Sequence, residues 1–120
     1  MKLRLRSEEA AGVCQIRAEG GIRSVEEPRD PRDLEELLGP SCYRRKILLD
    51  LQDAPQIDSS GVSWLVHFHK SCRAAGGMLI LHSVPPAVMA VLKLLGMEHY
   101  FNLAANERAA LGLAQGGKSS

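Results

Sequence analysis

Hydrophobic and polar positions alternate in two short segments at the start of the chain. The apolar positions of this alternation are Leu3, Leu5, Val13, Ile16 and Ala18. A period of two is typical of strands with one buried face, because successive side chains point to opposite faces. Since Gly12 lies between the two segments, the pattern predicts a β-hairpin over about residues 2–19.

Two later segments are almost entirely apolar: residues 46–51, Lys-Ile-Leu-Leu-Asp-Leu, and residues 78–81, Met-Leu-Ile-Leu. Such runs are typical of strands buried on both faces of a partly parallel sheet. Between them, the capping residues 58–61 and the pair Gly76-Gly77 bound a helical pattern that ends at about Ala75. A strand, a crossover helix and a second strand predict a right-handed, parallel βαβ unit.

Weaker patterns predict the remaining elements. Leucines spaced i, i+3, i+4 indicate a short helix after a loop at residues 20–31, with Asp33 or Asp30 as its cap and Gly39-Pro40 at its end. Pro85-Pro86 opens a third helix that ends near Gly96. Residues 100–103 form a last short strand, and Asn106 caps a final helix to about residue 114.

The order of these elements predicts one α/β domain over residues 1–114, followed by a flexible tail at 115–120. We expect a mixed β-sheet of four to five strands with helices mainly on one face. A chain of 120 residues fits a single domain. The residues expected together in one core are Leu48, Leu49, Leu51, Leu65, Phe68, Leu79, Ile80 and Leu92.

Composition narrows the classes of function. Fifteen basic and 14 acidic residues give a net charge of +1, so no global field favours nucleic acid. The longest apolar stretch, residues 85–92, is far shorter than the roughly 20 residues that span a bilayer, so we expect no membrane insertion. The three cysteines, Cys14, Cys42 and Cys72, are odd in number and far apart. They favour a reducing, cytoplasmic setting, in which they act as small apolar residues.

The sharpest local motif is Asp58-Ser59-Ser60-Gly61, directly before the helix. Asp and Ser are the commonest helix caps, so a purely structural role is the simplest interpretation. The same place also suits a negatively charged group, because the first backbone N–H groups of a helix have no intrahelical partner. From the tetrapeptide alone, both interpretations stay open.

Other chemistry finds little support in the sequence. His67 and His69 are two residues apart, about 200° around a helix, and cannot hold one metal ion together there. No Gly-x-Ser-x-Gly elbow accompanies the serines, and no phosphate-binding Gly-x-x-x-x-Gly-Lys loop is present. We therefore expect no catalytic residues, no metal, no cofactor and no enzymatic activity.

Four landmarks occur here in an order and spacing that resemble STAS domains, specifically the bacterial anti-sigma factor antagonists. They are the strand Ile47-Leu48-Leu49-Asp50-Leu51, the box Asp58-Ser59-Ser60-Gly61-Val62, the segment Gly76-Gly77-Met78-Leu79-Ile80-Leu81, and the helix from Pro86-Ala87-Val88 to Leu95-Gly96. The resemblance covers the C-terminal half to two-thirds of the chain.

The resemblance implies a STAS fold and a binding module that is switched by phosphorylation. Such a module captures an anti-sigma serine kinase and thereby releases a sigma factor. In the family the phosphoacceptor directly follows the Asp, which implies Ser59 here. The partner-binding residues are then Asp58, Ser59, Ser60, Gly61 and Trp64. We expect a monomer or weak homodimer that binds no nucleic acid.

One alternative within the family remains. Trp64, His67 and Phe68 replace the small or charged residues usual in the second helix of the switched antagonists. A related branch of STAS proteins lacks the switch. Its members serve as constitutive subunits of a stress-signalling assembly or of a lipid-transport ATPase complex.

Overall fold

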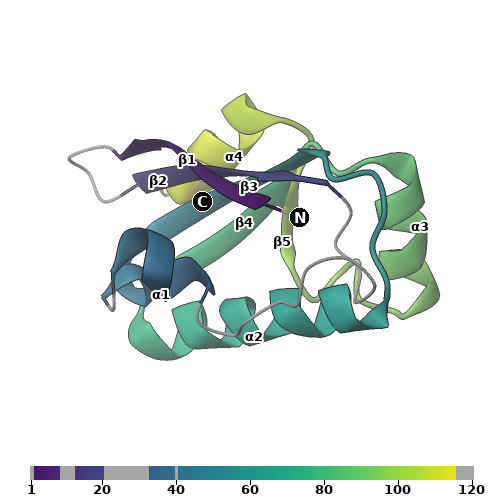
Figure 1. Cartoon of the computed structure of the whole chain (residues 1–120), viewed down its shortest axis with the longest axis horizontal. Helices are drawn as coiled ribbons and strands as arrows, with labels where there is room; N and C mark the ends of the chain where they lie inside the picture. Colours follow the sequence, from purple (N-terminus) through teal and green to yellow (C-terminus); the bar gives the residue numbers. More distant parts are fainter. Residues whose placement is uncertain (1, 9–12, 21–32, 40, 116–120) are drawn as a thin grey trace.

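The computed structural model describes residues 2–8, 13–20, 33–39 and 41–115 (Figure 1). The expected hairpin turn at Gly12, the loop from residue 21, the candidate cap Asp30 and the tail from residue 116 lie outside these ranges. The statements below concern the described residues.

Five strands form one sheet in the order in which they occur in the sequence. They are β1 (Lys2–Glu8), β2 (Val13–Glu19), β3 (Lys46–Asp53), β4 (Met78–His82) and β5 (Asn102–Ala104). β1 pairs antiparallel with β2, and every other pair is parallel. The predicted hairpin, the mixed sheet and the parallel βαβ unit are therefore confirmed.

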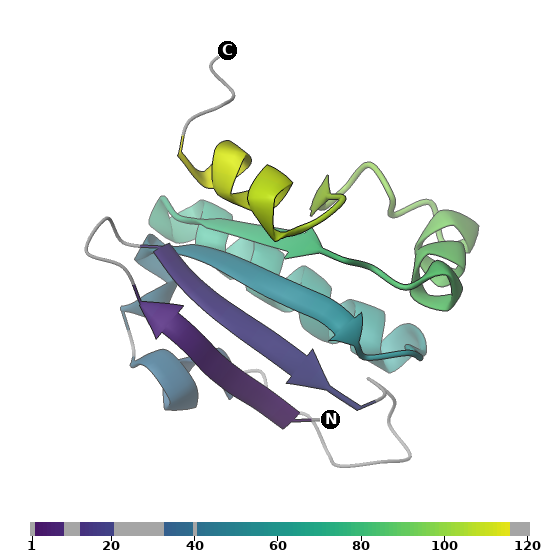
Figure 2. The ribbon, with the colours of Figure 1, turned by 90° about the horizontal axis from the view of Figure 1, so that it is seen from above.

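The helices are α1 (Asp33–Leu38), α2 (Ser59–Ala75), α3 (Pro86–Leu94) and α4 (Glu107–Ala114), with a 3₁₀ turn η1 (Cys42–Arg44) that the sequence did not indicate. α1 and α2 cover one face of the sheet, and α4 lies on the other (Figures 1 and 2). The expectation of helices mainly on one face is confirmed, with α4 as the exception.

The alternating side chains of β3 explain why both faces are covered. Ile47, Leu49 and Leu51 point into the larger core cluster, which includes Leu65 and Phe68 of α2. Leu48 instead joins a smaller cluster on the opposite face. That cluster also holds Val13, Ile80, Ala110 and Ala114. The prediction of one core was therefore wrong for Leu48 and Ile80: both are buried, but the sheet itself separates them from α2.

The predicted element ends are accurate to within about two residues, as hydrogen-bond patterns at frayed ends allow. α3 begins at Pro86 with Pro85 as its cap, and Gly96 follows with a positive φ of 69°. β5 begins at Asn102 rather than residue 100, because Tyr100 still belongs to a turn, in which its N–H donates to the Met97 carbonyl at 3.0 Å.

Candidate functional site

The connection from β3 to α2 carries the motif found in the sequence. After the strand, the Ala54 N–H donates to the Leu51 carbonyl at 3.0 Å, and Ile57 is buried. These contacts anchor the connection at both ends. The next four residues, 58–61, form the start of α2, where unpaired backbone N–H groups and the helix dipole favour an acceptor or an anion.

Asp58 is the N-cap of α2. Its backbone is extended, and its Oδ1 atom accepts a hydrogen bond from the Gly61 N–H at 3.0 Å. The first intrahelical bond runs from the Val62 N–H to the Asp58 carbonyl, also at 3.0 Å. The capping interpretation is thus confirmed for Asp58. It does not explain the two serines, whose hydrogen bonds have to be considered separately.

The two serine hydroxyls have different surroundings although both are exposed. The Ser60 Oγ donates to Asp58 Oδ1 at 2.7 Å, so this hydroxyl belongs to the cap. The Ser59 hydroxyl makes no hydrogen bond with any residue of the described ranges. Ser59 is therefore the one whose oxygen a second molecule reaches without breaking the cap.

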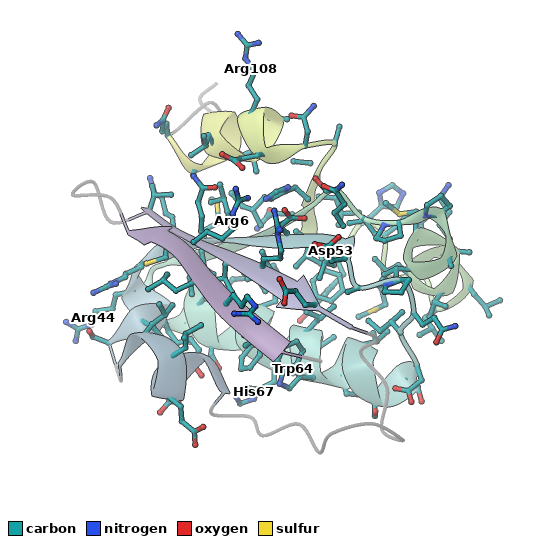
Figure 3. The ribbon with its side chains drawn as sticks, turned by 45° about the horizontal axis from the view of Figure 1, so that its top comes forward. Arg6, Arg44, Asp53, Trp64, His67 and Arg108 are labelled. Carbon is teal, nitrogen blue, oxygen red and sulfur yellow. The ribbon has the colours of Figure 1, made fainter. Side chains whose placement is uncertain are left out.

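Two further residues named from the sequence lie inward. Gly61 is buried, and its N–H is already used by Asp58. Trp64 is only 5% exposed and packs edge-on against Phe68, with ring centroids 4.7 Å apart. The indole therefore contributes mainly to the core. The exposed residues that follow Ser59 at intervals of four along α2 are Ser63 and His67; Figure 3 labels Trp64 and His67.

The histidines occupy separate places. His67 is exposed on α2, whereas His69 is buried among aromatic rings. His82 pairs in register with Asp50 and lies on the face of the sheet that α4 covers, so the sheet separates it from α2. Its Nδ1 atom lies 2.9 Å from the Ser83 Oγ. Burial lowers the pKa of His82. Within the described residues, no group of three or more His, Cys, Asp or Glu side chains could hold a metal ion.

The three cysteines behave as the sequence predicted. All are buried and none is in a disulfide. Burial raises the pKa of the Cys42 thiol to about 11 and that of Cys72 to about 12. Protonated thiols are poor nucleophiles and poor metal ligands, so Cys42 and Cys72 serve as small core residues.

No helix in the described part of the chain is long and apolar enough to cross a bilayer. The longest, α2, has 17 residues and carries a polar face with exposed His67 and Lys70.

The geometry defines an α/β domain with an exposed serine at the capped start of its second helix, and comparison with known proteins gives the family. The family model for the STAS domain matches residues 4–110. The chain therefore belongs to the STAS domain family. A comparison with curated proteins found no match.

Solved structures agree in fold over nearly the whole chain. A candidate anti-sigma factor antagonist from Thermotoga maritima superposes with a TM-score of 0.77 at 18% identity, covering 94% of each chain. The unphosphorylated form of the anti-sigma factor antagonist SpoIIAA gives 0.70 at 19%, covering 96% of this chain and 97% of that one. A sulfate transporter family protein from Wolinella succinogenes gives 0.72 at 21%, covering 92% and 89%. At these identities the likeness shows the fold.

Proposed function

We propose that this protein is an anti-sigma factor antagonist whose binding is switched by phosphorylation of Ser59. In its unphosphorylated form it captures an anti-sigma serine kinase in the bacterial cytoplasm and so releases a sigma factor. It acts as a ligand and a substrate of that kinase, with no catalytic residue or cofactor of its own, as a monomer or weak homodimer.

The observation that carries the proposal is the difference between the two hydroxyls. Asp58 orders the start of α2 and holds Ser60 at 2.7 Å, while Ser59 stays exposed beside it. A kinase can therefore phosphorylate the Ser59 hydroxyl without breaking any hydrogen bond of the cap. Phosphorylation of Ser60 would first have to break its bond to Asp58. Membership of the STAS family and the fold likeness to SpoIIAA support the same assignment.

The proposed switch works between molecules. A phosphate adds about 1.5 to 2 negative charges at pH 7, and the positive end of the helix dipole tolerates them. The fold should therefore survive modification. A partner that packs over residues 58–60 must instead desolvate both the phosphate and the Asp58 carboxylate, which opposes binding.

Three variants test the proposal by calorimetric titration with the candidate kinase of the host and by phosphosite mass spectrometry. Ser59→Asp should leave the melting temperature nearly unchanged but weaken capture at least about tenfold, or 1.4 kcal/mol. Ser59→Ala should keep binding and lose phosphate incorporation. Ser60→Ala should still be phosphorylated. As a matched control, Ser41→Asp adds the same charge at an exposed serine before η1 and should bind normally.

Equal kinase affinity for wild type and Ser59→Asp would overturn the switch. Phosphate found only on Ser60 would overturn the choice of acceptor. Reduced binding by Ser41→Asp as well would show that net charge, rather than position, controls capture.

A second candidate function is that of a constitutive STAS subunit in a stress-signalling assembly or a lipid-transport ATPase complex. One observation favours it: Leu94, at the end of α3, is 84% exposed and Leu95 is 47% exposed. Contiguous exposed apolar side chains mark surfaces that meet another protein, and these two leucines are neighbours in the chain. Co-purification of a stable complex from the host, unaffected by Ser59→Asp but lost in Leu94→Asp, would decide for this candidate.

A further inference from the structure

A buried histidine of α2, His69, packs against the segment that leads into the last strand. Its side chain is 3% exposed, and the rings of Tyr100 and Phe101 lie against it with centroids at 4.8 and 5.6 Å. These two residues directly precede β5, an edge strand that pairs with β4 along only three residues. Because so short a ladder supplies few hydrogen bonds, the aromatic contact with α2 is important for keeping β5 in the sheet.

The imidazole makes no hydrogen bond in this contact. Neither Nδ1 nor Nε2 of His69 has a partner among the described residues. A buried polar atom without a partner is costly, and a phenylalanine would fill the same aromatic site without that cost. Packing alone therefore does not account for a histidine here. The property that a phenylalanine lacks is the ability to take up a proton near neutral pH.

The surroundings of His69 oppose protonation of the ring where it lies. Burial is the main cause that lowers its pKa from the ordinary value of 6.5, and Arg73, one turn further along α2, adds a like charge. No carboxylate among the described residues raises this pKa. The facing rings of Tyr100 and Phe101 are uncharged, and attraction to an aromatic face offsets only part of the cost of burying a cation.

His82, the other histidine whose pKa is lowered by burial, has different surroundings. It lies on the opposite face of the sheet, where Asp50 and Glu107 raise its pKa and Arg6 lowers it by a smaller amount. A proton on His82 therefore faces two carboxylates, whereas a proton on His69 faces only another cation. The two buried histidines should respond differently to acid, and only His69 has to leave its site.

A cavity beside His69 gives the ring a place to go. Its volume is about 380 Å³, and His69 and Tyr100 are both among its lining residues. Arg73 and Gly76, which also line it, are exposed, so the cavity is open to solvent. A rotation of the imidazole into this space would take both ring nitrogens from the aromatic contact to water, which stabilises the protonated form.

We propose that the contact of His69 with Tyr100 and Phe101 is an acid-sensitive latch on β5. Near neutral pH the uncharged imidazole holds the aromatic pair against α2. In acid the protonated ring turns into the cavity, and the aromatic pair and β5 are released from α2 while the rest of the sheet stays folded. Because the pKa of the closed form is lowered, the latch contributes stability above about pH 6.5 and loses it as the pH falls through the lowered value.

An NMR titration of the full chain from about pH 7 to about pH 5 tests the latch. We expect the imidazole signals of His69, assigned by their loss in His69→Phe, to titrate with a midpoint below 6.5. The ring signals of Tyr100 and Phe101 should move at the same midpoint, and the methyl signals of Leu48 and Leu49 in β3 should not. Proton uptake by His69 with the two rings unmoved, or loss of all native signals together, would overturn the proposal.

Amide hydrogen exchange measures the size of the effect. A histidine of ordinary pKa that is protonated only in the open form favours opening by up to about 25-fold at pH 5 relative to pH 7. After correction for the intrinsic exchange rate, the protection of the β5 amides should fall at least about fivefold over this range. It should stay below the protection of the β3 amides at both pH values. Equal protection in the two strands would mean that both exchange through global unfolding, which contradicts a latch.

Three variants separate the proton on His69 from other effects of acid. His69→Phe should stay folded and remove both the ring movements and the fall in β5 protection. Arg73→Gln, an exposed change that carries the test if His69→Phe fails to fold, should raise the His69 midpoint because the like charge is gone. Lys70→Gln removes an exposed cation of the same helix that does not shift this pKa, and should leave the midpoint in place. Ring movements that persist in His69→Phe, or a midpoint unchanged by Arg73→Gln, would overturn the proposal.

Discussion

Gly77 joins α2 to β4 where the chain passes close to the backbone between η1 and β3. A methyl group added to Gly77 would lie 2.9 Å from the Arg44 carbonyl carbon and closer still to the backbone oxygens of Tyr43 and Arg45. Those atoms cannot turn away as the end of a side chain could. We expect Gly77→Ala to displace the start of β4 and to stretch the 3.1 Å bond from the Met78 N–H to the Arg45 carbonyl.

The magnitude follows from these two effects. Forcing extra volume into a packed site costs about 1–3 kcal/mol, and more where backbone must move. Loss of the backbone hydrogen bond adds about 1 kcal/mol. We therefore expect Gly77→Ala to lower the free energy of unfolding by about 3 kcal/mol, the middle of the summed range. For a chain of this size that corresponds to a melting temperature lower by about 12 °C.

Two other glycine positions, one adjacent and one in α4, supply controls. Gly76 has φ 87° and open space around a new methyl group, so Gly76→Ala should cost only the left-handed backbone strain of about 1–2 kcal/mol. A methyl group at Gly112 in α4 also meets nothing within 4 Å, so Gly112→Ala should stabilise the helix by up to about 1 kcal/mol.

Urea unfolding followed by the fluorescence of Trp64, the single tryptophan, measures all three variants. The reasoning predicts the stability order Gly112→Ala, Gly76→Ala, Gly77→Ala. It would be refuted if Gly77→Ala were as stable as Gly76→Ala.

Three further outcomes are expected. Leu49→Ala should lower the free energy of unfolding by about 2–5 kcal/mol in urea titration, because Leu49 is 1% exposed in the larger core; unchanged stability would contradict its place there. Asn106→Ala should cost about 1 kcal/mol by thermal melting, because its Oδ1 accepts the Ala109 N–H at 2.9 Å; Asn106→Asp should retain most of the stability. Raised pKa values of about 11 for Cys42 and about 12 for Cys72 mean that the folded chain keeps both thiol protons above pH 9 while the unfolded chain loses them. Stability should therefore fall as pH rises from 9 towards 11, and Cys72→Ala should flatten that slope; an equal slope would contradict the burial.

The buried strands and the glycine and proline boundaries could be predicted because each depends on local chemistry. The almost entirely apolar run at residues 47–51 required cover on both faces, and Gly76 ended α2 as its left-handed cap. The apolar pattern of these residues did not predict which helix covers which face of the sheet. That assignment depends on Ala110 and Ala114 meeting Leu48, a contact between segments more than 60 positions apart that no local period records.

The candidate site could be predicted only for the residues of the helix cap, because only these depend on neighbours in the sequence. Asp58 and its two serines are neighbours in sequence, so their positions at the helix start could be read from the motif. Trp64 was assigned to the binding surface through the family resemblance, whereas the structure buries it against Phe68. From the sequence, His69 was considered as a metal ligand and as one of four histidines that could assist a serine nucleophile. Its burial against the ring of Tyr100, from a distant segment, had no signal in the sequence.

The order of the strands across the sheet has a consequence for how the chain folds. Because the order is β1-β2-β3-β4-β5, each strand after the first pairs with the strand made just before it. Loop closure for every such pairing spans only one connecting segment, although the parallel pairs, which need a crossover connection, form more slowly than the antiparallel pair of β1 and β2. During synthesis from the N-terminus, the sheet can grow one strand at a time, each arriving strand finding its neighbour already in place. Only α4 must wait for the end, since it returns across β3 and β4 to close the second face.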